Sequence, residues 1–423
     1  MSDDTRFSSP LAAALAPGLL ERFQRYVAVE TTSRRDRDRS PSTPGQLELG
    51  RMLAGELRAL GAADVVLDAH GYVTATVPGS GPPIGLLAHL DTSPDAPGAG
   101  VRPLVHRGYD GGVIELPAGG TRLDPAAMPE LRAKLGHDLV SSSGDTLLGA
   151  DDKAGVAIIM SAAAHLLAHP ELPRTALRIC FTPDEEIGEG ATLFDIGRFG
   201  ARCAYTLDGS EVGELQDESF SAQEAVVSVE GVEVHPGQAH GKMVNALGLA
   251  ARIVAGLPAE LTPERTAGRE GFIHVHELSG DVARAEIRAI LRDFDEELLA
   301  GHLALLHRTV DAVAAGEPRA RVRVDVRWQY RNMRRFLEPV PEVVAAAQEA
   351  MREEGIEPVR TPIRGGTDGS RLSEMGLPTP NIFTGGHEYH SVREWASVQD
   401  MAAAAAVVVR LAGVWAQRVV SGS

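Results

Sequence analysis

Phe181-Thr-Pro-Asp-Glu-Glu-Ile-Gly188 is the stretch on which the interpretation of the whole chain depends. It overlaps an apolar run, residues 177–181, which predicts a buried strand that Pro183 ends. Glu185 and Glu186 are adjacent, so their side chains leave the strand end in different directions. One carboxylate can therefore bind a metal ion while its neighbour faces a water molecule. The alternative is an ordinary solvated acidic turn, because turns are usually polar.

Two further apolar strands end in the same way. Residues 84–91 predict a strand that ends at His89 and Asp91, and their spacing of two places both side chains on one face. A carboxylate beside an imidazole can fix its tautomer, although His89 could equally be a buried core histidine. Residues 204–209 predict a third strand, which ends at Asp208. Ligands gather at the carboxyl ends of strands in open α/β sheets, so these side chains predict one shared site.

Asp151 and Asp152 precede an apolar helix that is expected over residues 156–167. Two acids at a helix entrance suit a metal site, although Asp is also a favoured N-cap residue. A phosphate-binding loop of the Walker type is excluded at this turn, because it lacks the Gly-x4-Gly-Lys-Ser/Thr pattern.

The candidate metal ligands are imidazoles and carboxylates: His89, Asp151, Glu186, Asp208 and His390. Nitrogen and oxygen ligands of this kind suit Zn²⁺ and also accept Mn²⁺ or Co²⁺. Five ligands exceed the need of one catalytic zinc ion, whereas two ions that share a bridging carboxylate would use all of them. Glu185 remains free of metal in this scheme and is the candidate general base.

The composition narrows the class of protein. A chain of 423 residues with 43% hydrophobic and 23% charged residues is globular and long enough for two or three domains. Its net charge of −17 argues against a nucleic acid partner and against an anionic membrane surface. Cys180 and Cys203 are expected to be buried thiols. We expect a soluble, cytoplasmic protein, because residues 1–6 lack the basic start of a signal peptide and the longest apolar run, residues 401–409, predicts a packed helix.

From about Glu224 the chain alternates as strand, helix, strand, strand, helix and strand. This order predicts a small α+β domain, residues 223–332, inserted into a larger domain made of residues 1–222 and 333–423. In the larger domain the first helix is expected at residues 19–27, after a loose segment from Met1 to about Pro17.

Six stretches of the chain resemble the metallopeptidase family that includes aminoacylase, carboxypeptidase G and peptidase T. They are Ala88-His-Leu-Asp-Thr-Ser-Pro-Asp95, Leu148-Gly-Ala-Asp-Asp-Lys-Ala-Gly155, Phe181-Thr-Pro-Asp-Glu-Glu186, Tyr205-Thr-Leu-Asp-Gly209, Ile363-Arg-Gly-Gly-Thr-Asp-Gly369, and Asn381-Ile-Phe-Thr-Gly-Gly386 with His390. The resemblance implies a zinc-peptidase α/β catalytic domain with a mixed central sheet flanked by helices. It also implies that the inserted α+β domain is a lid that mediates dimerisation.

The resemblance implies a role for each candidate ligand by its position in these motifs. His89 and Asp208 would bind one of two Zn²⁺ ions in each subunit, and Glu186 and His390 would bind the other. Asp151 would bridge the two ions. In relatives the peptide bond after the bridging residue is cis, so a cis bond is expected after Asp151.

The resemblance also implies catalytic and substrate-binding residues. Asp91 would orient His89, and Glu185 would move a proton from the bridging water to the leaving amine. His235, Arg364 and Asn245 would contact the peptide substrate, with Asn332 as a further candidate. Two of these residues have an alternative interpretation. His235 can be an ordinary turn residue, and Arg364 can be a surface residue of a Gly-rich loop. His387 departs from the family pattern and offers a second histidine near His390.

The leading hypothesis is an aminopeptidase that removes the N-terminal residue of tripeptides and acts as a homodimer. Another amide hydrolase of the same family is the first alternative: a dipeptidase, a carboxypeptidase or an N-acyl amino acid deacylase. A metal-binding protein without catalysis is the second alternative, and the presence of Glu185 as a base argues against it.

Overall fold

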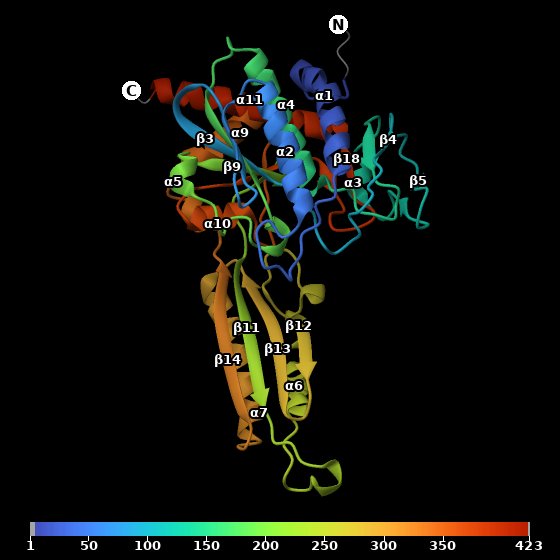
Figure 1. Ribbon diagram of the computed structural model, residues 1–423, viewed down its shortest axis with the longest axis vertical. Coiled ribbons are helices and arrows are strands. Elements are labelled where there is room, and N and C mark those ends of the chain that lie inside the picture. The colour runs from blue at the N-terminus through green and yellow to red at the C-terminus, as the bar shows by residue number, and fades with distance from the viewer. Residues whose placement is uncertain (1–4, 422–423) are drawn as a thin grey trace. The chain divides into compact units, whose positions relative to one another are not determined.

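The computed structural model describes residues 5–421, and the chain divides into two compact units (Figure 1). The first unit comprises Met1–Asp217, Arg335–Thr361 and Thr367–Ser423, and the second comprises Glu218–Arg334 and Pro362–Gly366. The sequence predicts an inserted domain at residues 223–332, whereas the second unit begins earlier, ends later and includes a separate short segment. That segment joins the unit because Ile363 pairs with Ser219 in a parallel bridge.

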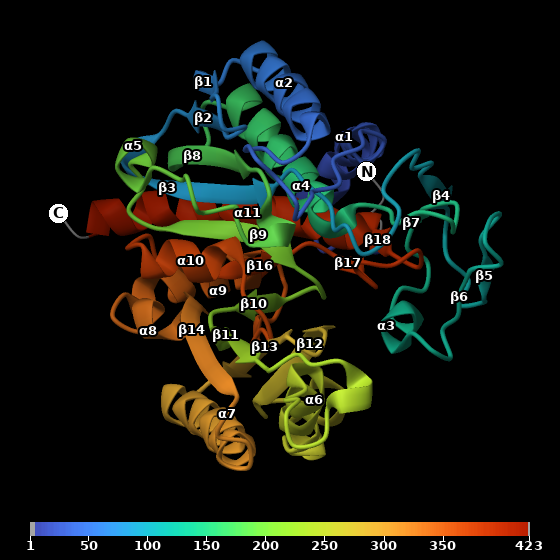
Figure 2. The ribbon, with the colours of Figure 1, turned by 60° about the horizontal axis from the view of Figure 1, so that its bottom comes forward.

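The first unit is built on a mixed sheet of eight strands (Figure 2). In spatial order they are β1 (Ala63–Leu67), β2 (Val73–Val77), β8 (Thr175–Thr182), β3 (Ser80–His89), β9 (Ala204–Gly209), β16 (Asn381–Phe383), β10 (Glu214–Gln216) and β15 (Val359–Arg360). The central strands β8, β3, β9 and β16 are parallel, whereas β1 and β2 run antiparallel to their neighbours. The expectation of an α/β fold with a mixed central sheet is confirmed.

Helices pack around this sheet and against one another. They are α1 (Pro10–Val27), α2 (Pro44–Ala59), α4 (Ala150–Ala168), α5 (Ile196–Phe199), α8 (Arg334–Leu337), α9 (Pro341–Glu353), α10 (Asp368–Glu374) and α11 (Val398–Ser421). Both α4 and α11 contact β3, and α2 contacts β1 and β2. The apolar stretch of α11 is long enough to cross a membrane, but 89% of that stretch is buried inside the protein. It is therefore a packed core helix, as the sequence predicts.

The first helix begins earlier than expected. The sequence predicts a loose segment up to about Pro17, whereas α1 begins at Pro10. Ser9 caps the helix by accepting an N–H of the first turn, and proline is well suited to the first helical position. Apolar residues are buried on both sides of Pro17, and their packing outweighs the hydrogen bond that proline cannot make. Residues 1–4 of the predicted loose segment lie outside the described residues.

A second, antiparallel sheet joins the C-terminal part of the first unit to residues 95–144, which the sequence predicts to be irregular with short strands. Its order is β17 (Gly386–His387), β18 (Trp395–Ser397), β7 (Leu139–Ser141) and β4 (Leu104–His106). The same region contains a hairpin of β5 (Ile114–Glu115) and β6 (Arg122–Leu123) and the short helix α3 (Pro129–Arg132). The loop between β17 and β18 carries His390 and is thus held by the sheet at both ends.

The second unit is a four-stranded antiparallel sheet with two helices packed on it (Figure 1). The sheet order is β12 (Phe272–Gly280), β13 (Arg284–Asp293), β11 (Ser221–Glu230) and β14 (Arg321–Tyr330), and the helices are α6 (Ala246–Ala255) and α7 (Glu296–Ala315). Buried side chains of β11 and β13, such as Val227 and Ile287, pack with Leu249 and Leu306 of the two helices. The order of elements along the chain is the strand and helix alternation that the sequence predicts.

Candidate active site

Three parallel strands bring most of the predicted site residues to one edge of the eight-stranded sheet. His89 at the end of β3 lies in register with Thr182 at the end of β8, and β9 is the other neighbour of β3. The turn after β8 carries Glu185 and Glu186, and β9 ends at Asp208 and Gly209. The carboxyl ends of these strands therefore gather acids and an imidazole in one place.

Asp151 lies between two histidines. Its Oδ1 is 2.8 Å from Nε2 of His89, and its Oδ2 is 3.1 Å from Nε2 of His390. Nε2 of His390 is also 3.0 Å from Oε2 of Glu186, and Nε2 of His89 is 3.9 Å from Oδ1 of Asp208. The five predicted ligands thus form one cluster with Asp151 at its centre. The predicted cis peptide bond between Asp151 and Asp152 is confirmed.

Asp91 contacts the acidic turn more closely than it contacts the imidazole. Its carboxylate accepts the backbone N–H of Glu185 at 2.9 Å and that of Glu186 at 3.1 Å. Its Oδ1 is 3.4 Å from Nδ1 of His89, which lies closer, at 3.0 Å, to the backbone oxygen of Asp91. Nδ1 donates to that carbonyl oxygen, and the same ring presents Nε2 to Oδ1 of Asp151. Asp91 therefore fixes both the imidazole and the two glutamates.

Burial and crowding shift the pKa values of the clustered acids. Burial raises the pKa of Glu185 well above its usual range, and Asp368 and Asp208 add to this effect. Burial likewise raises the pKa of Glu186 to about 7, with a further contribution from Asp151. Burial alone would raise the pKa of Asp151 too, but hydrogen bonds from His390 and His89 lower it below its usual range. The site thus crowds buried acidic groups whose ionised forms a bound cation would stabilise.

The residues at this cluster fit divalent metal ions. Oε1 of Glu186 is buried and has no hydrogen-bond partner within residues 5–421, so a carboxylate oxygen is left to bind a cation. The ligand atoms of His89, Asp151 and Glu186 lie close enough together to hold one ion, and so do those of His89, Asp152 and Asp208. In the group of His89, Asp152 and Asp208, we take Asp151 and not Asp152 as the third ligand. The carboxylate of Asp152 already accepts the backbone N–H groups of His89 and Gly155.

Sequence reasoning missed Asp368 and Asp184. Asp368 is buried, accepts the hydroxyl of Thr182 at 2.7 Å, and lines a small pocket with His89, Glu185 and Asp208. Burial raises its pKa to about 6. The sequence motif at residues 363–369 contains Asp368, but its Gly-rich pattern indicates a loop and no acid chemistry.

Asp184 holds the acidic turn from the side of α2. Its φ is +58°, a left-handed conformation that Asp tolerates better than most residues. Its carboxylate accepts the backbone N–H of Ser42 at 2.8 Å and Nε2 of Gln46 at 2.8 Å, and its own N–H donates to Oε1 of Gln46. Only the fold brings residues 42–46 against this turn, so local sequence contains no signal for the contact.

His387 belongs to a different cluster from His390. Its ring stacks on Trp395, with centroids 4.2 Å apart, and its Nε2 lies 3.8 Å from Glu211. His387, Glu211 and Asp400 could together hold a metal ion by distance. Nζ of Lys134, however, lies 2.5 Å from Glu211 and 2.8 Å from Asp400, so this cluster already contains a cation.

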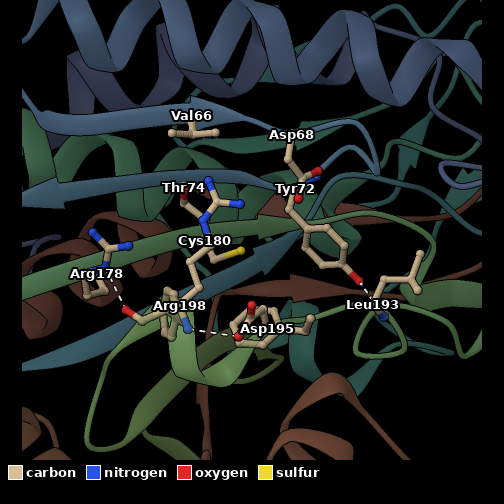
Figure 3. A pocket seen from close by; sticks show the side chains of 11 residues that line it. Val66, Asp68, Tyr72, Thr74, Arg178, Cys180, Leu193, Asp195 and Arg198 are labelled. Carbon is tan, nitrogen blue, oxygen red and sulfur yellow. Dashed lines mark hydrogen bonds between the residues drawn. The ribbon is translucent and has the colours of Figure 1, made fainter.

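A separate pocket of about 50 Å³ lies between β2, β8 and α5, and its lining includes no predicted site residue (Figure 3). Tyr72, Cys180 and Phe199 contribute to its wall. The hydroxyl of Tyr72 donates to the backbone oxygen of Gly190. Burial raises the pKa of the Cys180 thiol, and both Cys180 and Cys203 are buried and free, as expected.

The predicted substrate-binding residues lie in the second unit, where each makes contacts within that unit. His235 is exposed and its Nδ1 accepts the N–H of Gly237, and Asn245 caps α6 by accepting the N–H of Gly248. Asn332 is buried, and its Oδ1 accepts the backbone N–H groups of Ser219 and Arg334. The contacts of His235 and Asn245 are those expected of a turn residue and a capping residue, whereas Asn332 bonds segments distant in the chain. A substrate role for these side chains remains a prediction.

Arg364 is engaged inside the second unit as well. Its guanidinium donates to the backbone oxygens of Gly268 and Glu270, at 2.8 Å each, and to Thr266. It also lies over the ring of Phe220, 5.2 Å from the centroid. A peptide carboxylate would have to replace some of these contacts to be bound by Arg364.

Comparisons of this chain with known proteins match it to one peptidase family. Residues 147–413 match the model of peptidase family M20/M25/M40. A relative named peptidase T, from Vibrio parahaemolyticus, is 47% identical over 404 residues, which cover 95% of this chain and 99% of the relative. The crystal structure of aminopeptidase PepT from Bacillus cereus superposes with a TM-score of 0.73 at 23% identity, over 94% of this chain and 98% of the other. A dinuclear metal-binding peptidase of family M20 from Bacillus subtilis gives a TM-score of 0.65 at 16% identity, over 96% and 99% of the two chains.

Proposed function

This chain belongs to peptidase family M20/M25/M40, and from that membership we propose that it is a metal-dependent aminopeptidase that releases the N-terminal residue of tripeptides. The relative at 47% identity is named peptidase T and matches this chain almost end to end. The observation that carries the proposal is the cluster of five nitrogen and oxygen ligands around Asp151, with Glu185 beside them.

In the proposed mechanism the two adjacent glutamates have different roles: Glu186 is a metal ligand and Glu185 is the general base. Two divalent ions held by the five ligands would polarise the scissile carbonyl group and lower the pKa of the attacking water. Glu185 accepts the proton of that water and delivers it to the leaving amine. Burial raises the pKa of Glu185, which strengthens its carboxylate as a base. Asp91 holds Glu185 in place through its backbone N–H.

Several finer points are also our proposals. The ions are Zn²⁺, with Mn²⁺ or Co²⁺ as substitutes, because the ligands are imidazoles and carboxylates. The second unit acts as a lid and dimerisation domain that supplies His235, Arg364 and Asn245 to a small peptide. The enzyme is a cytoplasmic homodimer, and nucleic acid and membrane are not among its partners.

Product analysis tests the proposed activity. The zinc-loaded enzyme is incubated with four substrates: a dipeptide, a tripeptide, a tetrapeptide and an N-acetylated tripeptide. The incubations are repeated after the metal is chelated, and the products are identified by mass spectrometry. We expect only the free tripeptide to lose its N-terminal residue, and we expect chelation to abolish the reaction. Cleavage of the acetylated tripeptide or the dipeptide instead would contradict the proposal and indicate another amide hydrolase of the family.

A further inference from the structure

Glu394 is a buried carboxylate to which the sequence assigns no role, and it contacts the turn that carries Asp151. Its side chain is 1% exposed. Its Oε2 accepts the backbone N–H groups of Leu148 at 2.7 Å and Gly149 at 2.8 Å, and its Oε1 accepts that of Asp151 at 3.0 Å. Three N–H groups at the start of α4 therefore converge on one carboxylate from a distant part of the chain.

The position of Glu394 is itself well fixed. Trp395, the next residue, is fully buried and begins β18, which pairs with β7 in the small antiparallel sheet. The loop before Glu394 carries His390, whose Nε2 contacts Asp151. The same short segment thus supplies one predicted ligand and holds the backbone of another.

The opposite side of the turn is held by Asp152. Its Oδ2 accepts the N–H of His89 and its Oδ1 accepts that of Gly155. The backbone around Asp151 is therefore tied to the strand of His89 on one side and to the segment of His390 on the other. Gly149 permits the sharp entry into α4, because its φ is +83°.

We propose that Glu394 is a positioning residue that holds the carboxylate of Asp151 between the two metal ions. Partners outside the ligands of metal sites commonly orient those ligands, and their loss typically lowers metal affinity by about 10- to 100-fold. Glu394 itself is not a metal ligand in this proposal, because its two oxygens accept backbone hydrogen bonds. The proposal depends on the proposed metal site at Asp151.

Glu394→Gln tests the proposal, because the amide keeps one acceptor oxygen and places an N–H₂ donor against backbone donors. Glu388→Gln is the matched control. It removes the same charge from the same loop, and the side chain of Glu388 pairs with Arg393 rather than with the Asp151 turn. Zinc affinity is measured by competition with a chromophoric chelator, and the melting temperature of the metal-free protein is measured alongside. Glu394→Asp is a second variant that keeps the charge but shortens the reach, in case the amide variant does not fold.

We expect zinc affinity at one or both sites to fall at least tenfold in the folded Glu394 variants and to stay unchanged in Glu388→Gln. Unchanged affinity with a lower melting temperature would assign Glu394 a purely structural role and overturn the proposal. An equal loss in Glu388→Gln would overturn it as well, because the effect would then come from charge alone. If the wild-type protein itself does not bind two ions, the metal site is refuted, which is distinct from the failure of Glu394 alone.

Discussion

Asp91→Asn is the substitution whose effect follows most directly from the geometry of the acidic turn. Asp91 is fully buried, and its carboxylate accepts the backbone N–H groups of both Glu185 and Glu186. The shape of the side chain is preserved by asparagine, but one acceptor oxygen becomes an N–H₂ group that faces a backbone donor. The variant therefore tests whether these two hydrogen bonds hold the proposed base and the proposed ligand in place.

The magnitude follows from the loss of one hydrogen bond to a charged acceptor. Such a bond contributes about 1.5–3 kcal/mol. Because about 1.4 kcal/mol corresponds to a factor of ten, kcat/KM for a tripeptide should fall about 10- to 150-fold. Zinc affinity should fall too, since Glu186 moves together with Glu185. Steady-state kinetics at saturating zinc and a zinc titration measure the two effects.

Asp68→Asn provides the matched control. Asp68 also accepts two backbone N–H groups, those of His70 at 2.8 Å and Tyr72 at 3.0 Å, but its turn carries no predicted site residue. We expect kcat/KM of this variant to stay near the wild-type value. If Asp91→Asn keeps kcat/KM within threefold of the wild type, or if Asp68→Asn loses as much, the proposed role of Asp91 is wrong.

Three further substitutions separate catalysis, metal binding and stability. Glu185→Gln should lower kcat by about 10²- to 10⁴-fold with zinc content unchanged, and full turnover would exclude Glu185 as the base. His390→Ala should lower the zinc content of dialysed protein from two ions per chain to one, and a stoichiometry of two would exclude His390 as a ligand. Lys134→Met leaves the buried carboxylate of Asp400 without its 2.8 Å partner, so it should destabilise the fold by about 3 kcal/mol. An unchanged melting temperature for that variant would show that the Lys134 contact contributes nothing.

The sequence predicts the parts of the fold that local pattern determines. The strands that end at His89 and Asp208 and the strand before Glu185 are short apolar runs followed by polar residues, and each lies close to its predicted position. The alternation of elements in the second unit is visible for the same reason. The convergence of the acids follows from the general placement of ligands at the carboxyl ends of parallel strands.

Contacts between distant segments could not be predicted in this way. Glu394 is separated by 246 positions from Leu148, whose N–H it accepts, and the tertiary packing of β17 and β18 against α4 brings the two segments together. The His-x-Asp spacing indicates the contact of Asp91 with the imidazole, but it contains no signal for the hydrogen bonds that the Asp91 carboxylate accepts from the turn after β8. The early start of α1 depends on Ser9 as a cap and on tertiary packing around Pro17.

Anomalous X-ray diffraction from crystals of the zinc-loaded protein, recorded on both sides of the zinc absorption edge, tests the two-metal site most directly. We predict two zinc peaks per chain on either side of the Asp151 carboxylate, one beside His89 and Asp208 and the other beside Glu186 and His390. A single peak, or two peaks that do not share Asp151, would contradict the two-metal arrangement and the mechanism built on it.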